Sequence, residues 1–310
     1  MVKFMLFFRH HLLLILRNPA LKLLALVLLI SSFRLGDRPA YRLFAATGQP
    51  ADYDAMLTDL AGADVVLFGE IHNVSLAHWL ELQVASDLLR RKGPGKLVLG
   101  LEMFERDVQP LLDQYGAGIL ADSAFERQSR PWPNYATDYR PLLELAKSQR
   151  ITLVATNAPQ PFARAVARGS LKALDKLSAA DRALLAPLPL TVDMTRPGYQ
   201  KMAAMFGDGS PHGGSTGASP IIQAQALKDA TMADAIRRNV APGQTLLHLN
   251  GSFHSDNYDG IAGYLKQYAP KLRVKTISLV TQTQLQAVDK ENQAVADYVI
   301  VVPEDMTRTY

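Results

Sequence analysis

Short apolar runs alternate with helical patterns from about residue 50 onward, and this alternation constrains the fold more than any other feature. Runs rich in Val, Ile and Leu occupy 65–69, 96–103, 151–157, 245–251, 274–280 and 297–302. Most are apolar on both faces, which is typical of parallel strands covered by helices on two sides. Helical spacing of apolar residues occupies 75–91, 139–149 and 220–239. We therefore expect an α/β fold with a mostly parallel sheet flanked by helices on both faces.

One part of the chain departs from this alternation. The segment 171–206 contains no strand-like run and several stretches compatible with helix, so we expect a small inserted helical subdomain. The segment that follows, 207–220, is rich in glycine and serine, which predicts a flexible surface loop. The predicted organisation is an N-terminal segment over 1–42 and one α/β domain over 43–310.

The N-terminal segment carries an uncharged apolar stretch, "LLALVLLISSF", from Leu23 to Phe33. Its length suits a signal-peptide core better than a bilayer span, which needs about 20 apolar residues. The basic, apolar lead-in before it is long for a signal peptide, so the segment could also stay uncleaved as a membrane anchor or lie on a membrane as an amphipathic helix. We expect a periplasmic or membrane-anchored protein of the cell envelope.

Charge and cysteine content exclude several classes of protein. Residues 1–42 hold seven Lys or Arg and one Asp, a charge of +6, which leaves −2 of the net +4 for the rest of the chain. A nucleic-acid partner is therefore not expected, because phosphate binding needs clustered positive charge. The chain has no cysteine, which excludes disulfides, zinc–thiolate sites and thiol nucleophiles, and argues against a lipoprotein.

A Gly-x-x-His motif occurs twice, each time at the end of a predicted strand. The first is Gly69–His72 and the second is Gly251–His254. Ligands of an open parallel sheet bind outside the carboxyl ends of its strands, so we expect the polar side chains at these ends to line one cleft. The side chains at the ends of the four strands concerned are Glu70, His72, Glu102, Asn157, Asn250, Ser252 and His254.

These side chains are compatible with two kinds of chemistry. His72, His254 and Glu102 would be sufficient ligands for a divalent metal such as Zn²⁺, with Glu70 to activate a bound water. The same four residues could act as general acid and base without a metal. The diagnostic motifs of metalloproteases, serine hydrolases and nucleotide-binding loops are absent from the sequence, so the pattern predicts a site more specifically than a reaction.

Structural roles are the alternative for each of these groups. Either motif histidine could simply cap a helix or satisfy a hydrogen bond, and Glu102 could pair with Arg106 or Arg164. We assign structural roles to His78 and His248, since one lies on a predicted helix and the other inside a predicted strand.

An aromatic stretch precedes the predicted helix at 139–149. It contains Trp132, Tyr135 and Tyr139 close to two prolines that stiffen the chain. Such a stretch could form a core corner under the helix. It could also form a flat apolar wall with a phenol, suited to a large planar ligand.

Several segments together resemble the ChaN-like haem-binding family of the Tiki superfamily. They are "FGEIHN", "GLEMFERDVQ", "ATNAPQPFARAVARG", "AQALKDATMA", "LNGSFHSD" and "ADYVIVVP", and the resemblance covers roughly residues 45–303. It implies a bacterial cell-envelope protein linked to haem or iron uptake. It also implies haem held in some members as stacked pairs across a homodimer, with a tyrosine ligand that suits ferric iron.

The resemblance also implies roles for particular residues. The candidate iron ligands are Tyr135, Tyr139 and Tyr199. The matching helix at 220–239 puts Gln225 and Asp229 near the cleft. The haem-binding set expected from residues and resemblance together is Trp132, Tyr135, Tyr139, Asn157, Tyr199, Gln225, Asp229 and Asn250.

Two functional hypotheses follow, with a third held beside them. The first is a non-catalytic haem-binding protein of the cell envelope that works in haem or iron uptake. The second is a hydrolase, esterase-like or peptidase-like, that uses Glu70, His72, Glu102 and His254 with or without a divalent metal. The third is a degenerate family member whose cleft serves as a scaffold for a partner protein.

Overall fold

The computed structural model describes residues 38–206 and 219–310. The apolar stretch at 23–33 and nearly all of the Gly/Ser-rich segment at 207–220 lie outside the described residues. The chain divides into two compact units, Met1–Ala40 and Tyr41–Tyr310, and the fold below is that of the second. Within the described ranges, no helix combines the length and the apolar character that a membrane crossing requires.

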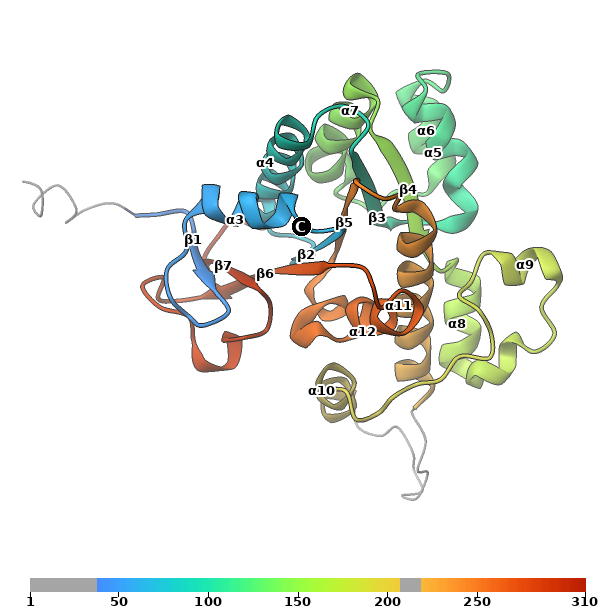
Figure 1. Ribbon diagram of the computed structural model, residues 1–310. Coiled ribbons are helices and arrows are strands. Elements are labelled where there is room, and N and C mark those ends of the chain that lie inside the picture. Colours follow the sequence, from blue (N-terminus) through green and yellow to red (C-terminus); the bar gives the residue numbers. More distant parts are fainter. Residues whose placement is uncertain (1–37, 207–218) are drawn as a thin grey trace, which may run out of the picture. The chain divides into compact units, whose positions relative to one another are not determined.

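The described strands form one seven-stranded sheet (Figure 1). The strands are β1 (Arg42–Ala45), β2 (Val65–Glu70), β3 (Leu97–Glu105), β4 (Thr152–Asn157), β5 (Thr245–Gly251), β6 (Val274–Gln282) and β7 (Tyr298–Pro303). Their order across the sheet is β1-β7-β6-β2-β5-β3-β4. Every neighbouring pair is parallel except β1 and β7, which are antiparallel. The expected α/β fold with a mostly parallel sheet is confirmed.

Helices cover both faces of the sheet, as the two-sided apolar runs predict. One face packs against α3 (Tyr53–Ala61), α4 (Ser75–Lys92), α5 (Gln109–Gly116), α6 (Asp122–Ser129) and α7 (Arg140–Gln149). The other packs against α10 (Pro197–Phe206), α11 (Pro220–Asn239) and α12 (Gly260–Tyr268). Strand β2 illustrates the division, because Val66 and Phe68 join the first core while Val65 and Leu67 join the second.

The strand order brings three distant segments together at the middle of the sheet. Strand β5 lies between β2 and β3, although it follows them in the chain by more than a hundred residues. In the parallel register, Glu70 at the end of β2 pairs with Gly251 at the end of β5. Parallel strands end at the same edge, so the polar ends of β2, β5 and β3 become neighbours.

Helices fill the chain between β4 and β5. They are α8 (Gln160–Gly169), a 3₁₀ turn at Leu171–Leu174, α9 (Ala179–Ala183), α10 and α11. Within the described part of 158–244 there is no strand, which agrees with the helical character expected for 171–206. Helix α8 packs on α11 through Val166 and Leu227.

Two local features differ from the sequence-based expectation. The antiparallel edge strand β1 and the helix α3 behind it, whose first turn is capped by the Asp52 carboxylate, carry no periodic pattern long enough to predict them. The helix expected at 139–149 begins at Arg140 with a proline in its first turn, and a π-helical turn at Tyr135–Tyr139 precedes it.

Candidate functional site

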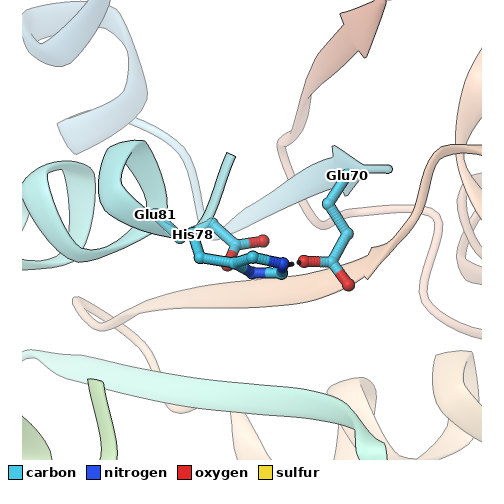
Figure 2. Close-up of side chains that lie close together, drawn as sticks. All are labelled: Glu70, His78 and Glu81. Carbon is cyan, nitrogen blue, oxygen red and sulfur yellow. Dashed lines mark hydrogen bonds and ion pairs between the residues drawn. The ribbon is translucent and has the colours of Figure 1, made fainter. Parts of the chain in front are cut away.

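The site begins with Glu70, the last residue of β2, whose carboxylate is buried. Its neighbours on the α4 side are His78 and Glu81, and all three side chains converge (Figure 2). His78 Nδ1 lies 3.0 Å from Glu81 Oε2 and 3.1 Å from Glu70 Oε2. The structural role expected for His78 agrees with this burial. Glu81 was missed, although a carboxylate three residues after His78 on an otherwise apolar helix face was a usable signal.

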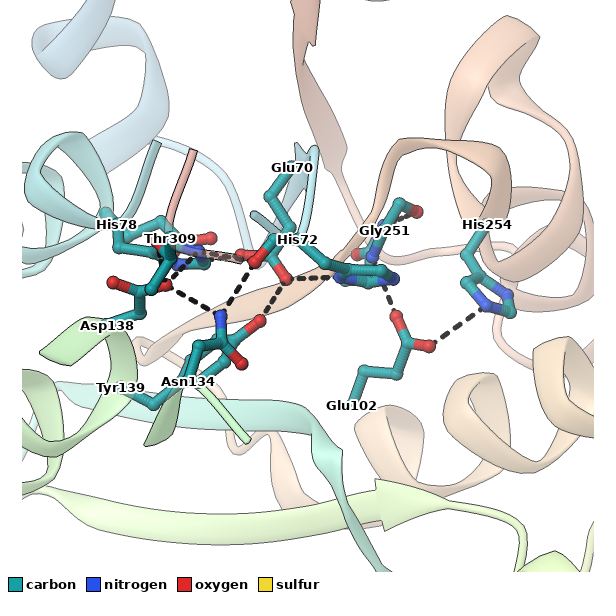
Figure 3. Close-up of polar contacts among 12 residues, drawn as sticks. Glu70, His72, His78, Glu102, Asn134, Asp138, Tyr139, Gly251, His254 and Thr309 are labelled. Carbon is teal, nitrogen blue, oxygen red and sulfur yellow. Dashed lines mark hydrogen bonds and ion pairs between the residues drawn. The ribbon is translucent and has the colours of Figure 1, made fainter. Parts of the chain in front are cut away.

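The other oxygen of Glu70 positions His72. Glu70 Oε1 accepts hydrogen bonds from His72 Nδ1 at 2.7 Å and from the Tyr139 hydroxyl at 2.6 Å (Figure 3). The His72 side chain is 38% exposed, and its Nε2 makes no hydrogen bond to any described residue. Burial opposes the charged form of His72, but Glu70 and then Glu102 outweigh it and raise its pKa. Trp132 packs edge-on against this imidazole, with ring centroids 4.7 Å apart.

A second buried group holds His254. Its Nε2 lies 3.1 Å from Glu102 Oε1, and its Nδ1 contacts the Asp229 carboxylate. The Tyr199 hydroxyl donates to Asp229 at 2.7 Å, and the Gly251 N–H donates to Glu102 at 2.7 Å. Each motif histidine is therefore held by a carboxylate that a buried tyrosine anchors in turn.

Both members of the pair formed by His254 and Glu102 are charged. Burial opposes ionisation of Glu102, but the charge and hydrogen bond of His254 outweigh it and lower the pKa of Glu102 to about 2. Burial also opposes the imidazolium of His254, but Glu102 and Asp229 outweigh it and raise its pKa to about 10. At neutral pH His254 therefore carries a positive charge. Its side chain is 7% exposed, whereas that of His72 is 38% exposed.

Both histidines open onto one pocket of about 410 Å³. The motif residues make part of its lining polar, and α10 and the turn after β5 add the apolar side chains of Met202, Met205 and Phe253. The residues that line it are Glu70, Ile71, His72, Met202, Met205, Gln225, Gly251, Ser252, Phe253 and His254. Two segments far apart in the chain, 70–72 and 202–254, thus share one site.

Of the three amides expected in the cleft, Asn157 and Asn250 hold the strand ends and Gln225 lines the pocket. Asn250 bonds to Gly251 and Ser255 rather than facing the pocket. Asn157 donates to the Glu102 carbonyl at 3.1 Å and so fixes the end of β3. Gln225 does line the pocket, with its Nε2 3.1 Å from His254 Nδ1.

The three tyrosines proposed as iron ligands are buried. The phenols of Tyr139 and Tyr199 are occupied by carboxylates, and none of the three lines the pocket. Tyr135 packs in the main core near Phe104 and Phe125. The aromatic stretch therefore forms a core corner, in which Trp132 touches the pocket residue His72 and Tyr139 bonds to the pocket residue Glu70.

The structure groups the metal-ligand side chains differently from the expected set. Among the described residues, Glu70, His78 and Glu81 offer ligand atoms within 4.8 Å of one another, and His72, His254 and Glu102 do not form such a group. The reason is that each motif histidine pairs with its own carboxylate. The expected alternative partner Arg106 pairs with Asp234 instead of Glu102.

The fold and the site together define a class of protein. Its members are α/β proteins with two Gly-x-x-His turns at the carboxyl edge of the sheet. The family model described as "Haem-binding uptake, Tiki superfamily, ChaN" matches residues 56–265. This chain therefore belongs to that family, and the resemblance seen in its motifs is confirmed.

Solved structures share the fold at low sequence identity. A structure described as cofacial haem binding to ChaN of Campylobacter jejuni is 16% identical with a TM-score of 0.64, and the match covers 86% of this chain and 99% of that chain. The type III effector HopBA1 is 13% identical, with a TM-score of 0.46 and coverage of 84% and 99%. An erythromycin esterase, EreC, is 15% identical, with a TM-score of 0.43 and coverage of 86% and 83%. No match was found among curated proteins.

Proposed function

We propose that this chain is a haem-binding protein of the cell envelope that works in haem or iron uptake. The observation that carries the proposal is the pocket itself, where a carboxylate-held imidazole faces an apolar wall. A planar apolar ligand with a central metal needs both features. Membership of the haem-binding family supports the same conclusion.

His72 is the residue that would hold the haem iron. A histidine that ligates a metal usually donates its other ring N–H to a carboxylate or carbonyl, and His72 Nδ1 already donates to Glu70. Met202, Met205 and Phe253 would contact the porphyrin faces. The expected tyrosine ligands Tyr135, Tyr139 and Tyr199 would first have to leave buried positions.

Localisation and assembly are further parts of the proposal. The basic and apolar segment at 1–42 supports export, either as a signal peptide or as an uncleaved anchor. A homodimer with stacked haem is supported by the description of the Campylobacter jejuni relative as binding haem cofacially. Analytical ultracentrifugation with and without haemin would test the dimer, which should form only in the presence of haemin.

A haemin titration of the full chain tests the ligand. We expect a shifted Soret band that saturates at a near-stoichiometric ratio, and a His72→Ala variant should lose the shift and regain it when free imidazole is added. A Soret band that survives in His72→Ala but disappears in a tyrosine variant would transfer the ligand role to that tyrosine. No shift in the wild-type protein would refute haem binding.

A matched pair of variants tests the apolar wall. Met205 and Ile119 are both exposed apolar residues, but only Met205 lines the pocket. Met205→Glu should weaken haemin binding because it places a charge on the wall, whereas Ile119→Glu should leave it unchanged. Equal effects of the two substitutions would contradict haem binding at this pocket.

A hydrolase is the second candidate, because the pocket presents one imidazolium and one more exposed imidazole side by side on its wall. His254 would stabilise developing negative charge and His72 would move the proton. A screen of ester and peptide substrates tests this role. Turnover that His72→Ala abolishes would support it, and turnover that His72→Ala leaves unchanged, or none in the wild-type protein, would exclude it.

A further inference from the structure

The cluster behind His72 extends beyond the proposed haem site, in which only Glu70 of its three members takes part by holding His72. It consists of Glu70 from the end of β2 and of His78 and Glu81 from α4, and all three side chains are almost fully buried. Figure 2 shows both carboxylates turned toward the imidazole of His78. Burial of two carboxylates beside one imidazole is costly unless something compensates their charge.

Hydrogen bonding fixes which nitrogen of His78 faces the carboxylates. His78 Nε2 lies 3.0 Å from the carbonyl oxygen of His72, which only accepts, so Nε2 carries a proton. Nδ1 is then the nitrogen that faces Glu70 Oε2 and Glu81 Oε2. This arrangement, with one ring nitrogen on a backbone carbonyl and the other on the ligand side, is the usual one for a metal-binding histidine.

The carboxylates are incompletely satisfied by this imidazole. A single Nδ1 proton can be directed at only one of two oxygens, and it serves Glu81 Oε2. Within the described part of the chain, Glu70 Oε2 and Glu81 Oε1 are buried and have no hydrogen-bond donor. Buried carboxylate oxygens that lack a donor and converge on an imidazole are a ligand set suited to a cation.

The charges of the neighbouring side chains also favour a cation at this cluster. Asp138 is a third buried carboxylate, with Oδ2 3.5 Å from His78 Nε2. It receives hydrogen bonds from Asn134 at 2.7 Å and from Thr309 at 2.8 Å, which are neutral donors. On the pocket side, the imidazole of His72 reaches only the other oxygen of Glu70. One imidazole therefore faces three buried carboxyl groups, whose negative charge can be offset by protons or by a divalent ion.

We propose that Glu70, His78 and Glu81 form a binding site for a divalent transition-metal ion. The two Nδ1–oxygen distances of 3.0 and 3.1 Å are already close to the ligand–ligand edge of such a site. That edge is about 3.3 Å for four ligands at zinc distances and about 3.0 Å for six ligands at manganese distances. One imidazole with two carboxylates suits Zn²⁺, Mn²⁺ or Fe²⁺. Glu70 also lines the pocket, so one of the proposed ligands borders a cavity.

Protons occupy the same place in the metal-free protein. Burial opposes the imidazolium of His78, but Glu81 and Glu70 outweigh it and raise its pKa to about 11. Burial and the charge of Glu70 together raise the pKa of Glu81 well above its ordinary range. Because an imidazole or a carboxyl group must lose its proton to bind a metal, uptake should release protons and weaken as the pH falls.

Metal uptake by matched variants tests the site. The full chain, stripped of metal, is dialysed against Zn²⁺ or Mn²⁺, and we expect about one ion bound per chain. Glu81→Gln should weaken binding by at least about 100-fold, because it removes a ligand rather than a supporting group. Glu102→Gln makes the same chemical change in the His254 pair and should leave uptake unchanged. Absence of uptake by the wild-type protein, or loss in Glu102→Gln alone, would overturn the proposal.

X-ray absorption of the zinc-loaded wild-type protein tests the site without any variant, in case Glu81→Gln does not fold. We expect one imidazole and otherwise oxygen ligands around the ion. Two imidazoles would place the ion on His72 and His254 and refute the assignment. The result does not depend on haem binding, since the haemin titration can succeed or fail separately.

Discussion

Gly251 lies so close to the imidazole of His72 that a Cβ atom at this position would be 2.8 Å from both Cε1 and Nε2. The first motif makes the reciprocal contact, because a Cβ on Gly69 would lie 3.0 Å from the Cα of Ser252. Each Gly-x-x-His turn therefore leaves room for the other. This is the physical reason that a glycine precedes each histidine by three residues.

Gly251→Ala should therefore disturb the site without straining the backbone. Gly251 has φ −57°, which alanine adopts freely, so the cost comes from the contact with His72. We expect a loss of about 1–3 kcal/mol in the free energy of unfolding, measured in urea, and weaker haemin binding. Gly116→Ala is the control, because its Cβ would meet only Leu153 at 3.7 Å. Equal stability of the two variants would contradict the packing argument.

The ion pair of Glu102 and His254 should stabilise the fold less in acid and less in alkali than near pH 6. The pKa of Glu102 lies below its ordinary 4.5, so its contribution is present above that value and is lost as the pH falls toward about 2. The pKa of His254 lies above its ordinary 6.5, so its contribution is full below that value and is lost as the pH rises toward about 10. The pair contributes most between these ordinary values.

Glu102→Gln tests this pH dependence. It leaves His254 with one carboxylate and should cost about 3 kcal/mol in the free energy of unfolding near pH 6. The cost should shrink in acid, since the wild-type protein then loses the same charge. Urea unfolding across the pH range measures both. A difference between variant and wild type that stays constant with pH would show that the pair is not ionised as described.

Tyr139→Phe should destabilise the protein through Glu70. The buried phenol donates to Glu70 Oε1 at 2.6 Å, and we expect a cost of about 1.5–3 kcal/mol in the free energy of unfolding. Tyr298→Phe is the control, because that phenol donates to the partly exposed Asp59, where water can replace it. The haemin Soret shift should survive in Tyr139→Phe. Its loss, together with a Soret shift that survives in His72→Ala, would identify Tyr139 as the iron ligand.

Thr309→Val should loosen the turn that carries His72. Thr309 Oγ1 donates to Asp138 at 2.8 Å, and its N–H donates to the Asn73 carbonyl at 2.9 Å. We expect a cost of about 1 kcal/mol in the free energy of unfolding and faster amide exchange at 71–75. Thr283→Val, which removes an exposed hydroxyl from Glu304, should change neither. Unchanged exchange in Thr309→Val would show that this contact does not hold the turn.

Much of the fold was accessible from the sequence because hydrophobic burial acts through short periodic patterns. Strand β5 was predicted with its observed bounds, Thr245–Gly251, and helix α11 with its bounds, Pro220–Asn239. Both are long runs with clear ends. Strand β1 has four residues at an edge, where pairing with β7 rather than its own pattern fixes its structure, and it was missed.

The site was accessible only in part. The strand-end rule collected His72, Glu102 and His254 from three distant segments, but it could not assign partners. Partners depend on side-chain directions that spacing does not encode, so the carboxylate of Asp229 next to His254 came from the family resemblance. The directions of the tyrosine side chains could not be predicted either. A phenol that faces a cleft and a phenol buried beneath it can occupy the same position in the sequence pattern.

The position of β5 between β2 and β3 has a consequence for synthesis on the ribosome. A nascent chain that has emerged only as far as residue 240 contains the first motif but lacks the strand that fills the middle of the sheet. Until that strand arrives, the facing edges of β2 and β3 have no partner and are open to pairing with other chains. The two histidines can therefore meet only late in translation, and a fragment that ends before residue 245 should aggregate rather than bind ligand.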